Sequence, residues 1–359
     1  MKIIISAGGT GGHLYPALAF TKYIKSKHPS VEFLFVGTKD RLEATVVPQH
    51  NYRYVGLNVK GLVGNPLQKG YKAMLFLKSI ATSKRIIKDF KPDIVIGFGG
   101  YPSASIVKAA QMLGVKTMIH EQNSIIGLTN KILIKKVDAI ICCYQKAYDV
   151  LPKEKTYLCG NPRESMIDIQ KNEATLKQFN LNHQQPIVLI FMGSLGSAIM
   201  NKTIVDVLNA CQDKPYQVVY VTGKSYYEEF SKHQFSNNIH VVPYVEDMPA
   251  LMIHCDVIVS RAGASSLAEI CALAVPSILV PSPYVASNHQ EYNARELVEQ
   301  NCATMILEKD FNQYRCIEEI DKILNEPFIV ESYLINMKKR AKLDACQNMY
   351  QVMMELIGD

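Results

Sequence analysis

The feature that most constrains the fold is the alternation of short apolar, β-branched runs with segments of helical periodicity. These runs form two series along the chain. The first series is Ile3–Ser6, Glu32–Val36, Ile94–Gly97, Lys116–Ile119 and Ala139–Cys142, and the second is Ile187–Met192, Gln217–Thr222, Ile239–Val242, Val257–Ser260 and Ser277–Val280. Near-continuous apolar strands separated by helices are typical of parallel sheets that are covered on both faces. The pattern therefore predicts two doubly wound α/β domains.

The composition agrees with two globular domains. The chain has 359 residues, of which 48% are hydrophobic and 20% are charged, and its formal net charge is +6. No apolar run approaches the roughly 18–20 residues that would cross a bilayer, and the first residues do not form a signal peptide. The nine cysteines are scattered without a CxxC pair, which favours reduced core thiols. We expect a chain that remains in the cytoplasm.

Four glycine-rich turns stand between a predicted strand and a predicted helix. They are "SAGGTGGH" (6–13), "GFGGYPSAS" (97–105), "MGSLGS" (192–197) and "SRAGASSLAE" (260–269). Such a turn brings backbone N–H groups and the positive end of a helix to one point, where they can hold a phosphate. A single turn of this kind could simply allow close packing of strand on helix. The chain has four such turns, and both predicted domains begin with an apolar strand followed by one of them. This pattern predicts that the protein binds more than one phosphate group.

Two common nucleotide motifs are excluded. The first turn contains no G-x-G-x-x-G, and the strand after it ends in Gly37-Thr38 instead of an acidic residue, so a dinucleotide site is not expected. "VTGKS" (221–225) resembles the end of a P-loop, but Val218 stands where that motif requires glycine. A dehydrogenase and a P-loop enzyme are therefore disfavoured.

The fourth turn carries side chains suited to a nucleotide sugar. Ser265 and Ser266 can bond a diphosphate or cap the helix, and Glu269 could accept hydrogen bonds from two neighbouring ribose hydroxyls. The alternative for Glu269 is a solvated helix residue. A dense polar cluster follows in "ASNHQEYNA" (286–294), for which a surface loop is the alternative.

Taken together, these segments resemble the MurG family, the cytoplasmic glycosyltransferases of bacterial peptidoglycan synthesis. The matching pieces, in family order, are "GGTGGH", "GGYPS", "HEQN", "GNP" with Arg163, "GSLGS", "VEDMP", "SRAGASSLAE" and "NHQEYNA". The resemblance implies a GT-B fold, with two Rossmann-like domains facing an interdomain cleft. We expect an N-terminal domain over 1–162, a UDP-GlcNAc-binding domain over 163–339, and a C-terminal helix of about 340–359 that packs back on the first domain.

The resemblance also implies the reaction. GlcNAc would move from UDP-GlcNAc to the C4 hydroxyl of MurNAc-pentapeptide on undecaprenyl diphosphate, with inversion at the anomeric carbon, so that lipid I becomes lipid II. No cofactor and no metal are expected, because the sequence holds no Asp-x-Asp pair. Further cell-wall synthesis proteins are conceivable partners, and nucleic acid is not expected.

The family's binding residues can be placed on this sequence by its motifs. The implied donor contacts are Thr10, Gly11, Gly12, Asn123, Arg163, Ser194, Val245, Ala264, Ser265, Ser266, Glu269 and Gln290. The implied acceptor contacts are Gly9, Gly99, Gly100, Tyr101 and Ser103.

Inversion needs a general base, and three residues are candidates. His13 stands at a predicted helix start, where the neutral imidazole is favoured and can accept a proton near neutral pH. His120 and Glu121 of "HEQN" are the rival bases. The alternative for His13 is a structural cap or a phosphate donor.

A basic and apolar segment between Lys60 and Lys91 suits a lipid-borne substrate. The segment has many basic residues and a single acidic residue, Asp89. Four consecutive apolar residues lie in its middle. Such residues point all round a helix, so they cannot all enter one core. The expected membrane contacts, at the cytoplasmic side of the cell membrane, are Leu75, Phe76, Leu77, Lys72 and Lys78. The alternative is a solvated charged helix.

Two other functions share parts of this pattern. A UDP-GlcNAc 2-epimerase, or another GT-B nucleotide-sugar enzyme, would use the same donor but would need no basic and apolar patch for a lipid acceptor. A non-catalytic nucleotide-sugar binding protein would need neither His13 nor "HEQN".

Overall fold

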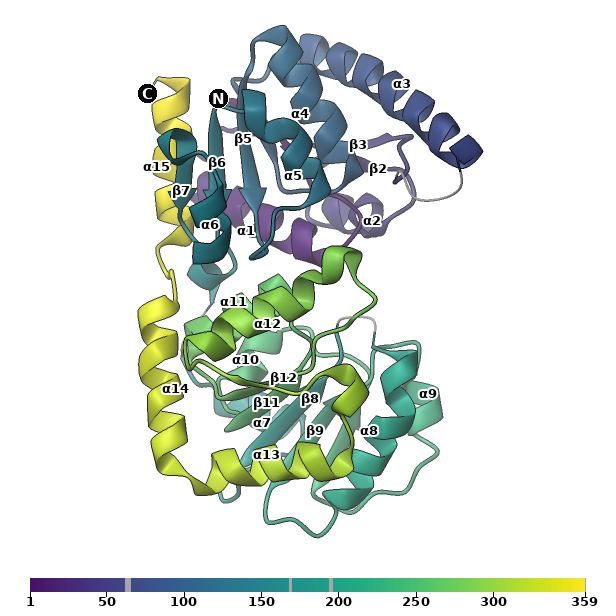
Figure 1. The fold of residues 1–359 in the computed structure, drawn as a ribbon, viewed down its shortest axis with the longest axis vertical. Coiled ribbons are helices and arrows are strands. Elements are labelled where there is room, and N and C mark those ends of the chain that lie inside the picture. The colour runs from purple at the N-terminus through teal and green to yellow at the C-terminus, as the bar shows by residue number, and fades with distance from the viewer. Residues whose placement is uncertain (62–65, 168–169, 194–195, 359) are drawn as a thin grey trace. The chain divides into compact units, whose positions relative to one another are not determined.

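The computed structural model describes residues 1–61, 66–167, 170–193 and 196–358, with the side chains of 66–69 left aside. The chain divides into two compact units (Figure 1). The first unit comprises Met1–Met166 and Lys342–Asp359, and the second comprises Ile167–Ala341.

The first unit is built on a parallel sheet of seven strands. These are β1 (Lys2–Ser6), β2 (Glu32–Thr38), β3 (Arg53–Leu57), β4 (Ile94–Gly97), β5 (Lys116–Glu121), β6 (Ala139–Cys142) and β7 (Thr156–Leu158). Their order across the sheet is β3-β2-β1-β4-β5-β6-β7, with Ile3 of β1 paired to Ile94 of β4. The direction of winding therefore reverses between β1 and β4.

Helices and short 3₁₀ turns connect these strands. They are α1 (Gly11–Lys27), α2 (Leu42–Gln49), α3 (Pro66–Phe90), α4 (Tyr101–Leu113), α5 (Leu128–Leu133), α6 (Gln145–Val150), η1 (Ile134–Lys136), η2 (Lys153–Lys155) and η3 (Glu164–Met166). The C-terminal helix α15 (Ala345–Ile357) also belongs to this unit.

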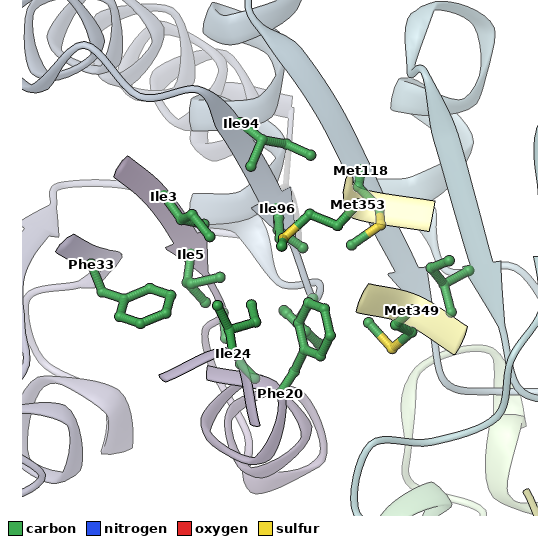
Figure 2. Packing of buried hydrophobic residues seen from close by; sticks show 14 of the residues in the cluster. Ile3, Ile5, Phe20, Ile24, Phe33, Ile94, Ile96, Met118, Met349 and Met353 are labelled. Carbon is green, nitrogen blue, oxygen red and sulfur yellow. The ribbon is translucent and has the colours of Figure 1, made fainter. Parts of the chain in front are cut away.

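The core of the first unit joins distant parts of the chain (Figure 2). Because alternate side chains of a strand point to the same face, Ile3 and Ile5 face one side of the sheet together. There they form one cluster with Phe20 of α1 and with Met349 and Met353 of α15. Burial of these apolar side chains holds the C-terminal helix on the first unit.

The second unit repeats the same plan with six parallel strands. These are β8 (Ile187–Phe191), β9 (Gln217–Val221), β10 (Ile239–Val242), β11 (Val257–Ser260), β12 (Ser277–Leu279) and β13 (Thr304–Met305), in the order β10-β9-β8-β11-β12-β13. Here the winding reverses between β8 and β11. The predicted fold class, two doubly wound parallel sheets, is confirmed.

The helices of the second unit vary more in length. They are α7 (Glu173–Gln178), α8 (Ala198–Ala210), α9 (Tyr227–Phe230), α10 (Met248–Met252), α11 (Ala264–Leu273), α12 (His289–Glu299), α13 (Gln313–Asn325) and α14 (Pro327–Arg340), with the 3₁₀ turns η4 (Ala286–Asn288) and η5 (Glu308–Asp310).

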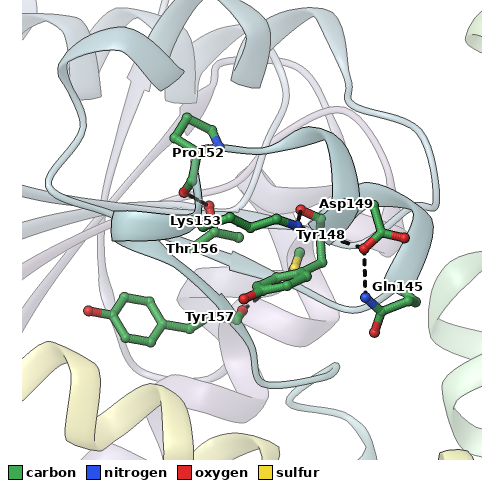
Figure 3. A network of polar contacts seen from close by, with 8 residues as sticks. Gln145, Tyr148, Asp149, Pro152, Lys153, Thr156 and Tyr157 are labelled. Carbon is green, nitrogen blue, oxygen red and sulfur yellow. Dashed lines mark hydrogen bonds and ion pairs between the residues drawn. The ribbon is translucent and has the colours of Figure 1, made fainter.

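Three strands absent from the prediction, β3, β7 and β13, all lie at sheet edges. Polar contacts within residues 145–157 surround the start of one of them, β7 (Figure 3). Lys153 donates to the carbonyl of Tyr148 at 2.5 Å and pairs with Asp149 at 3.7 Å. Thr156, the first residue of β7, donates to the carbonyl of Pro152 at 2.6 Å. An edge strand of this kind depends on its neighbours more than on an apolar run of its own.

Within the described ranges, no helix is both long enough and apolar enough to cross a membrane.

Candidate functional site

The four glycine-rich turns lie at the two points where the sheets reverse their winding. The turns after β1 and β4 adjoin in the first unit, and in the second unit β8 and β11, which precede the other two turns, are paired strands. In open α/β sheets, ligands bind outside the carboxyl ends of the strands at this switch point. Each unit therefore brings two turns, distant in sequence, to the place where a ligand is expected.

The two turns of the first unit interlock through their backbones. Gly100 has a φ of +83°, and a Cβ built on it would collide with the carbonyl oxygen of Gly8. A Cβ on Gly8 would in turn lie 2.5 Å from the ring of Pro102. Both positions require glycine because the chains approach too closely for a side chain. The sequence prediction placed the loop 8–12 at the acceptor diphosphate without naming Gly8 as a contact, because its close approach to Gly100 and Pro102 depends on the tertiary structure.

The predicted acceptor residues occupy different positions in these turns. Gly9 and Gly99 have φ values of +91° and +113°, which glycine adopts readily. Tyr101 is exposed, at the start of α4. Ser103 is buried, and its hydroxyl donates toward the carbonyls of Ser6 at 2.8 Å and Gly99 at 2.7 Å. Ser103 therefore holds the second turn to the first strand.

His13 lies in the first turn of α1 with one ring nitrogen engaged by the backbone. Its Nδ1 is 2.9 Å from the carbonyl oxygen of Gly8 and 3.4 Å from the hydroxyl of Thr10. A carbonyl oxygen only accepts, so Nδ1 carries the proton and Nε2 carries the lone pair of the neutral ring. The ring rests against Gly99, where a Cβ would lie 2.7 Å from Nε2. This tautomer suits a general base.

The N-terminus of α1 presents backbone donors. Thr10 is the N-cap residue and makes no side-chain cap hydrogen bond. The first N–H groups of a helix have no partner within it, and Gly11 and Gly12 supply two of them without side-chain bulk. The helix dipole adds about half a positive charge. This end of α1 is suited to a phosphate oxygen.

The two rival bases are both buried. His120 and Glu121 are each 1% exposed, so a substrate hydroxyl does not reach them in this conformation. Burial lowers the pKa of His120 to about 4, and its Nε2 lies 3.4 Å from the thiol of Cys143. Burial also raises the pKa of Glu121, against hydrogen bonds that favour its charged form.

Glu121 anchors the segment that follows β5. Its carboxylate accepts from the backbone N–H of Gly127 at 2.8 Å and from the amide of Asn130 at 2.9 Å. It also accepts from Asn123, through the backbone N–H at 3.1 Å and the side-chain amide at 3.3 Å. The predicted donor residue Asn123 is thus held in place by Glu121. Asn130 was not predicted, and no local signal marks it.

The predicted donor residue Arg163 lies in the first unit, just before η3. Its backbone N–H donates to the side chain of Asn161 at 3.0 Å, and its side chain is half-buried.

The turn after β11 places the predicted diphosphate residues at the start of α11. Gly263 is the N-cap and makes no side-chain cap, and Ala264 begins the helix. The hydroxyl of Ser265 is buried without a hydrogen-bond partner among the described residues, whereas Ser266 is half-buried. A buried hydroxyl of this kind is complemented by an acceptor such as a phosphate oxygen.

Glu269 lies on the second turn of α11 and is buried, so the solvated alternative is wrong. Ser194, the other predicted diphosphate contact, lies outside the described residues.

The two remaining donor residues lie on neighbouring segments of the second unit. Val245 follows β10, and its side chain is buried. Gln290 is on the first turn of α12, and its amide oxygen accepts from the backbone N–H of Ser282 at 2.9 Å. The amide orientation is thereby set, and Gln290 can offer N–H donors to a ligand.

The predicted membrane helix α3 has one buried and one exposed face. Leu75 is 7% exposed and belongs to the core, so its predicted membrane contact is wrong. The same face carries Ser79, whose hydroxyl lies 2.6 Å from that of Ser105 on α4.

Three apolar side chains at helical spacing line the exposed face of α3: Tyr71, Met74 and Leu77. Phe76 and Lys72 are half-buried, and Lys78 is exposed.

Among the described residues, no group of three or more histidine, cysteine, aspartate or glutamate side chains could hold a metal ion. The nine cysteines, all within the described ranges, form no disulfide, and all but Cys143 are buried.

Comparisons with known proteins cover the full chain. The glycosyltransferase family 28 N-terminal domain matches residues 3–142, and the corresponding C-terminal domain matches residues 187–350. A Bacillus licheniformis protein is 42% identical over 99% of this chain and 99% of its own length. A Limosilactobacillus fermentum protein is 39% identical over 100% of this chain and 99% of its own.

Both relatives are named UDP-N-acetylglucosamine–N-acetylmuramyl-(pentapeptide) pyrophosphoryl-undecaprenol N-acetylglucosamine transferase. The crystal structure of Acinetobacter baumannii MurG covers 99% of both chains with a TM-score of 0.78 at 23% identity. That similarity establishes the GT-B fold.

Proposed function

The chain belongs to glycosyltransferase family 28, and on that premise we propose that it is the transferase for which its full-length relatives are named. It transfers GlcNAc from UDP-GlcNAc to the C4 hydroxyl of MurNAc-pentapeptide on undecaprenyl diphosphate. The epimerase alternative is not favoured, because relatives at about 40% identity over the whole chain carry the transferase name.

The observation that carries the mechanism is the fixed tautomer of His13. The carbonyl of Gly8 holds the proton on Nδ1, so Nε2 takes the proton from the acceptor hydroxyl as that oxygen attacks the anomeric carbon. The bond between the anomeric carbon and the β-phosphate oxygen breaks in the same step. UDP leaves with the electron pair, and a single displacement inverts the anomeric centre.

The second unit holds the leaving group in this proposal. The N-terminus of α11 provides backbone N–H groups and the positive end of its dipole, and Ser265 adds a buried hydroxyl. Preorganised donors of this kind stabilise negative charge as it develops. Glu269 binds the ribose hydroxyls, the backbone at Val245 reads uracil, and Gln290 donates to the sugar.

The first unit holds the acceptor diphosphate in this proposal. Gly9, Gly99 and Gly100 shape a backbone surface between the starts of α1 and α4. Thr10, Gly11 and Gly12 lie at the helix start that carries His13, and in this proposal they contact the donor.

The exposed face of α3 supports peripheral binding to the cytoplasmic surface of the membrane. Tyr71, Met74 and Leu77 are exposed apolar side chains, and Lys78 and Arg85 are exposed on the same helix. Each lysine or arginine near an anionic lipid surface contributes about 1 kcal/mol. The enzyme would thus bind its lipid-linked acceptor at the membrane surface in which that lipid is embedded.

The direct test is to incubate the protein with UDP-GlcNAc and a lipid I analogue and to identify the products by mass spectrometry. We expect the analogue to gain one GlcNAc residue with release of UDP. Conversion of UDP-GlcNAc to UDP-ManNAc without acceptor would establish an epimerase instead.

A further inference from the structure

Arg261 occupies a position where a phosphate ligand would be expected. It directly follows β11 and stands two residues before Gly263, the N-cap of α11. A guanidinium forms bidentate bonds to phosphate, so its place in the sequence alone favours direct contact with the donor diphosphate.

The structure turns the Arg261 side chain into the protein instead. Its side chain is 7% exposed. Its Nη1 donates to the carbonyl of Val280 at 3.0 Å, and its Nη2 donates to the hydroxyl of Ser197 at 3.3 Å. Nη2 also lies 2.5 Å from a carboxylate oxygen of Glu308, an ion pair without hydrogen-bond alignment.

Both side chains of the Arg261–Glu308 pair are buried. The Glu308 side chain is 9% exposed, so both charges lie away from water. A buried charge is strongly destabilising without its partner. Glu308 therefore holds the Arg261 guanidinium beside Ser197 and away from a ligand. We call the group Arg261, Ser197 and Glu308 the junction.

This junction joins the two glycine-rich turns of the second unit. Arg261 belongs to the turn after β11, and Ser197 is the N-cap of α8, at the end of the turn after β8. The neighbouring Gly196 is locked as well, since a Cβ on it would collide with the carbonyl oxygen of Thr222. Because β8 and β11 are paired strands, the Arg261 side chain spans the switch point of this sheet.

We propose that Arg261 is a positioning residue for the donor diphosphate, which sets the spacing of the α8 and α11 N-termini and does not bind the donor itself. This inference rests on the proposed function, which assigns the donor diphosphate to the start of α11, and it adds the start of α8 to the same site. The charge on the leaving UDP is then met by backbone donors whose separation the Arg261–Ser197–Glu308 junction maintains.

Glu308→Gln is the informative variant, because Glu308 lies on η5 and has no assigned contact with the donor. It keeps the side-chain shape and removes the charge that holds Arg261. Arg261→Lys keeps the positive charge and removes the planar fork. Titration calorimetry on the full chain would compare binding of UDP, which carries the diphosphate, with binding of uridine, which lacks it.

We expect both variants to bind UDP about tenfold more weakly, equivalent to one charge-assisted hydrogen bond lost through misalignment, with uridine affinity unchanged. Asp321→Asn is the matched control, since it breaks the Lys214–Asp321 pair of 2.5 Å in the same unit. It should leave UDP affinity unchanged. Equal loss of UDP affinity in the control would reduce the effect to general destabilisation and overturn the proposal.

Two other results would also overturn it. If Arg261→Lys weakens UDP binding and Glu308→Gln does not, Arg261 binds the phosphate directly. If both variants bind UDP like the wild type, the junction has no role in the site. A wild-type chain that does not bind UDP would contradict the proposed function itself.

Ser197→Ala tests the same junction if Glu308→Gln does not fold. It removes one neutral acceptor from the half-buried start of α8. We expect a smaller loss of UDP affinity that is not additive with Arg261→Lys, because the two changes remove the same contact. Full additivity would show that Ser197 and Arg261 act separately.

Discussion

His13→Asn separates a catalytic role for the histidine from a structural one. The amide nitrogen of asparagine can take the place of Nδ1 and donate to the carbonyl of Gly8, 2.9 Å away in the wild type. That hydrogen bond is worth about 1 kcal/mol, so the melting temperature should hardly change. The variant has no atom at the position of Nε2, and it therefore loses the base.

The expected loss follows from the role of a positioned base. General base catalysis contributes about 10²–10⁴ in rate, or about 3–5 kcal/mol of transition-state stabilisation. Single-turnover transfer to a lipid I analogue should slow by that factor, with unchanged affinity for UDP-GlcNAc. In the wild type the rate should fall toward acid pH, because the protonated ring cannot accept a proton. That acid limb should be absent from the variant.

Gly99→Ala provides an independent check that leaves His13 in place. The new Cβ would lie 2.6 Å from Cδ2 and 2.7 Å from Nε2 of the ring, at a φ of +113° that disfavours alanine. The displaced ring should lower the single-turnover rate while keeping an acid limb. If the His13→Asn variant slows transfer by only about threefold, the loss is far smaller than a general base contributes. That result would refute the assignment of His13 as the base.

Further expectations concern the donor, the membrane surface and the glycine turns. Glu269→Ala should weaken UDP-GlcNAc binding by about 2 kcal/mol through loss of charge-assisted hydrogen bonds, and calorimetry with unchanged affinity would remove Glu269 from the ribose. Replacing Met74 and Leu77 together with serine should reduce binding to anionic vesicles and leave turnover of a short-chain acceptor unchanged. Leu75→Ser should instead lower the melting temperature, because Leu75 is buried. Vesicle binding by the double variant equal to that of the wild type would contradict the surface assignment. Gly100→Ala should destabilise the first unit in thermal unfolding, because its Cβ meets the facing backbone carbonyl at a φ of +83°, and an unchanged midpoint would show that the turns can separate without cost. Transfer should persist in EDTA, and activity that is lost with EDTA and restored by magnesium would show that the leaving group needs a metal.

The central strands could be predicted because they are buried on both faces. Strands such as Ile94–Gly97 and Val257–Ser260 are continuous apolar runs, and the structure has the same bounds. The edge strand Arg53–Leu57 is half-exposed and lacks such a run. Its strand conformation depends on pairing with Glu32–Thr38, which a local pattern does not contain.

The glycine-rich turns could also be predicted from the sequence. Close backbone approach and a positive φ both favour glycine over any other residue. What each turn does with its neighbours was decided by tertiary structure. Leu75 and Leu77 look alike in sequence, yet Leu75 is buried and Leu77 is exposed, because α3 packs one face against α4. Packing also buried Glu121, whose carboxylate accepts from amide donors on the segment that follows it. The loss of water around a side chain arises only when separate strands and helices come together. The sequence alone therefore determined which residue types stand at each turn, and the tertiary structure decided which side chains are buried and which remain open to a ligand.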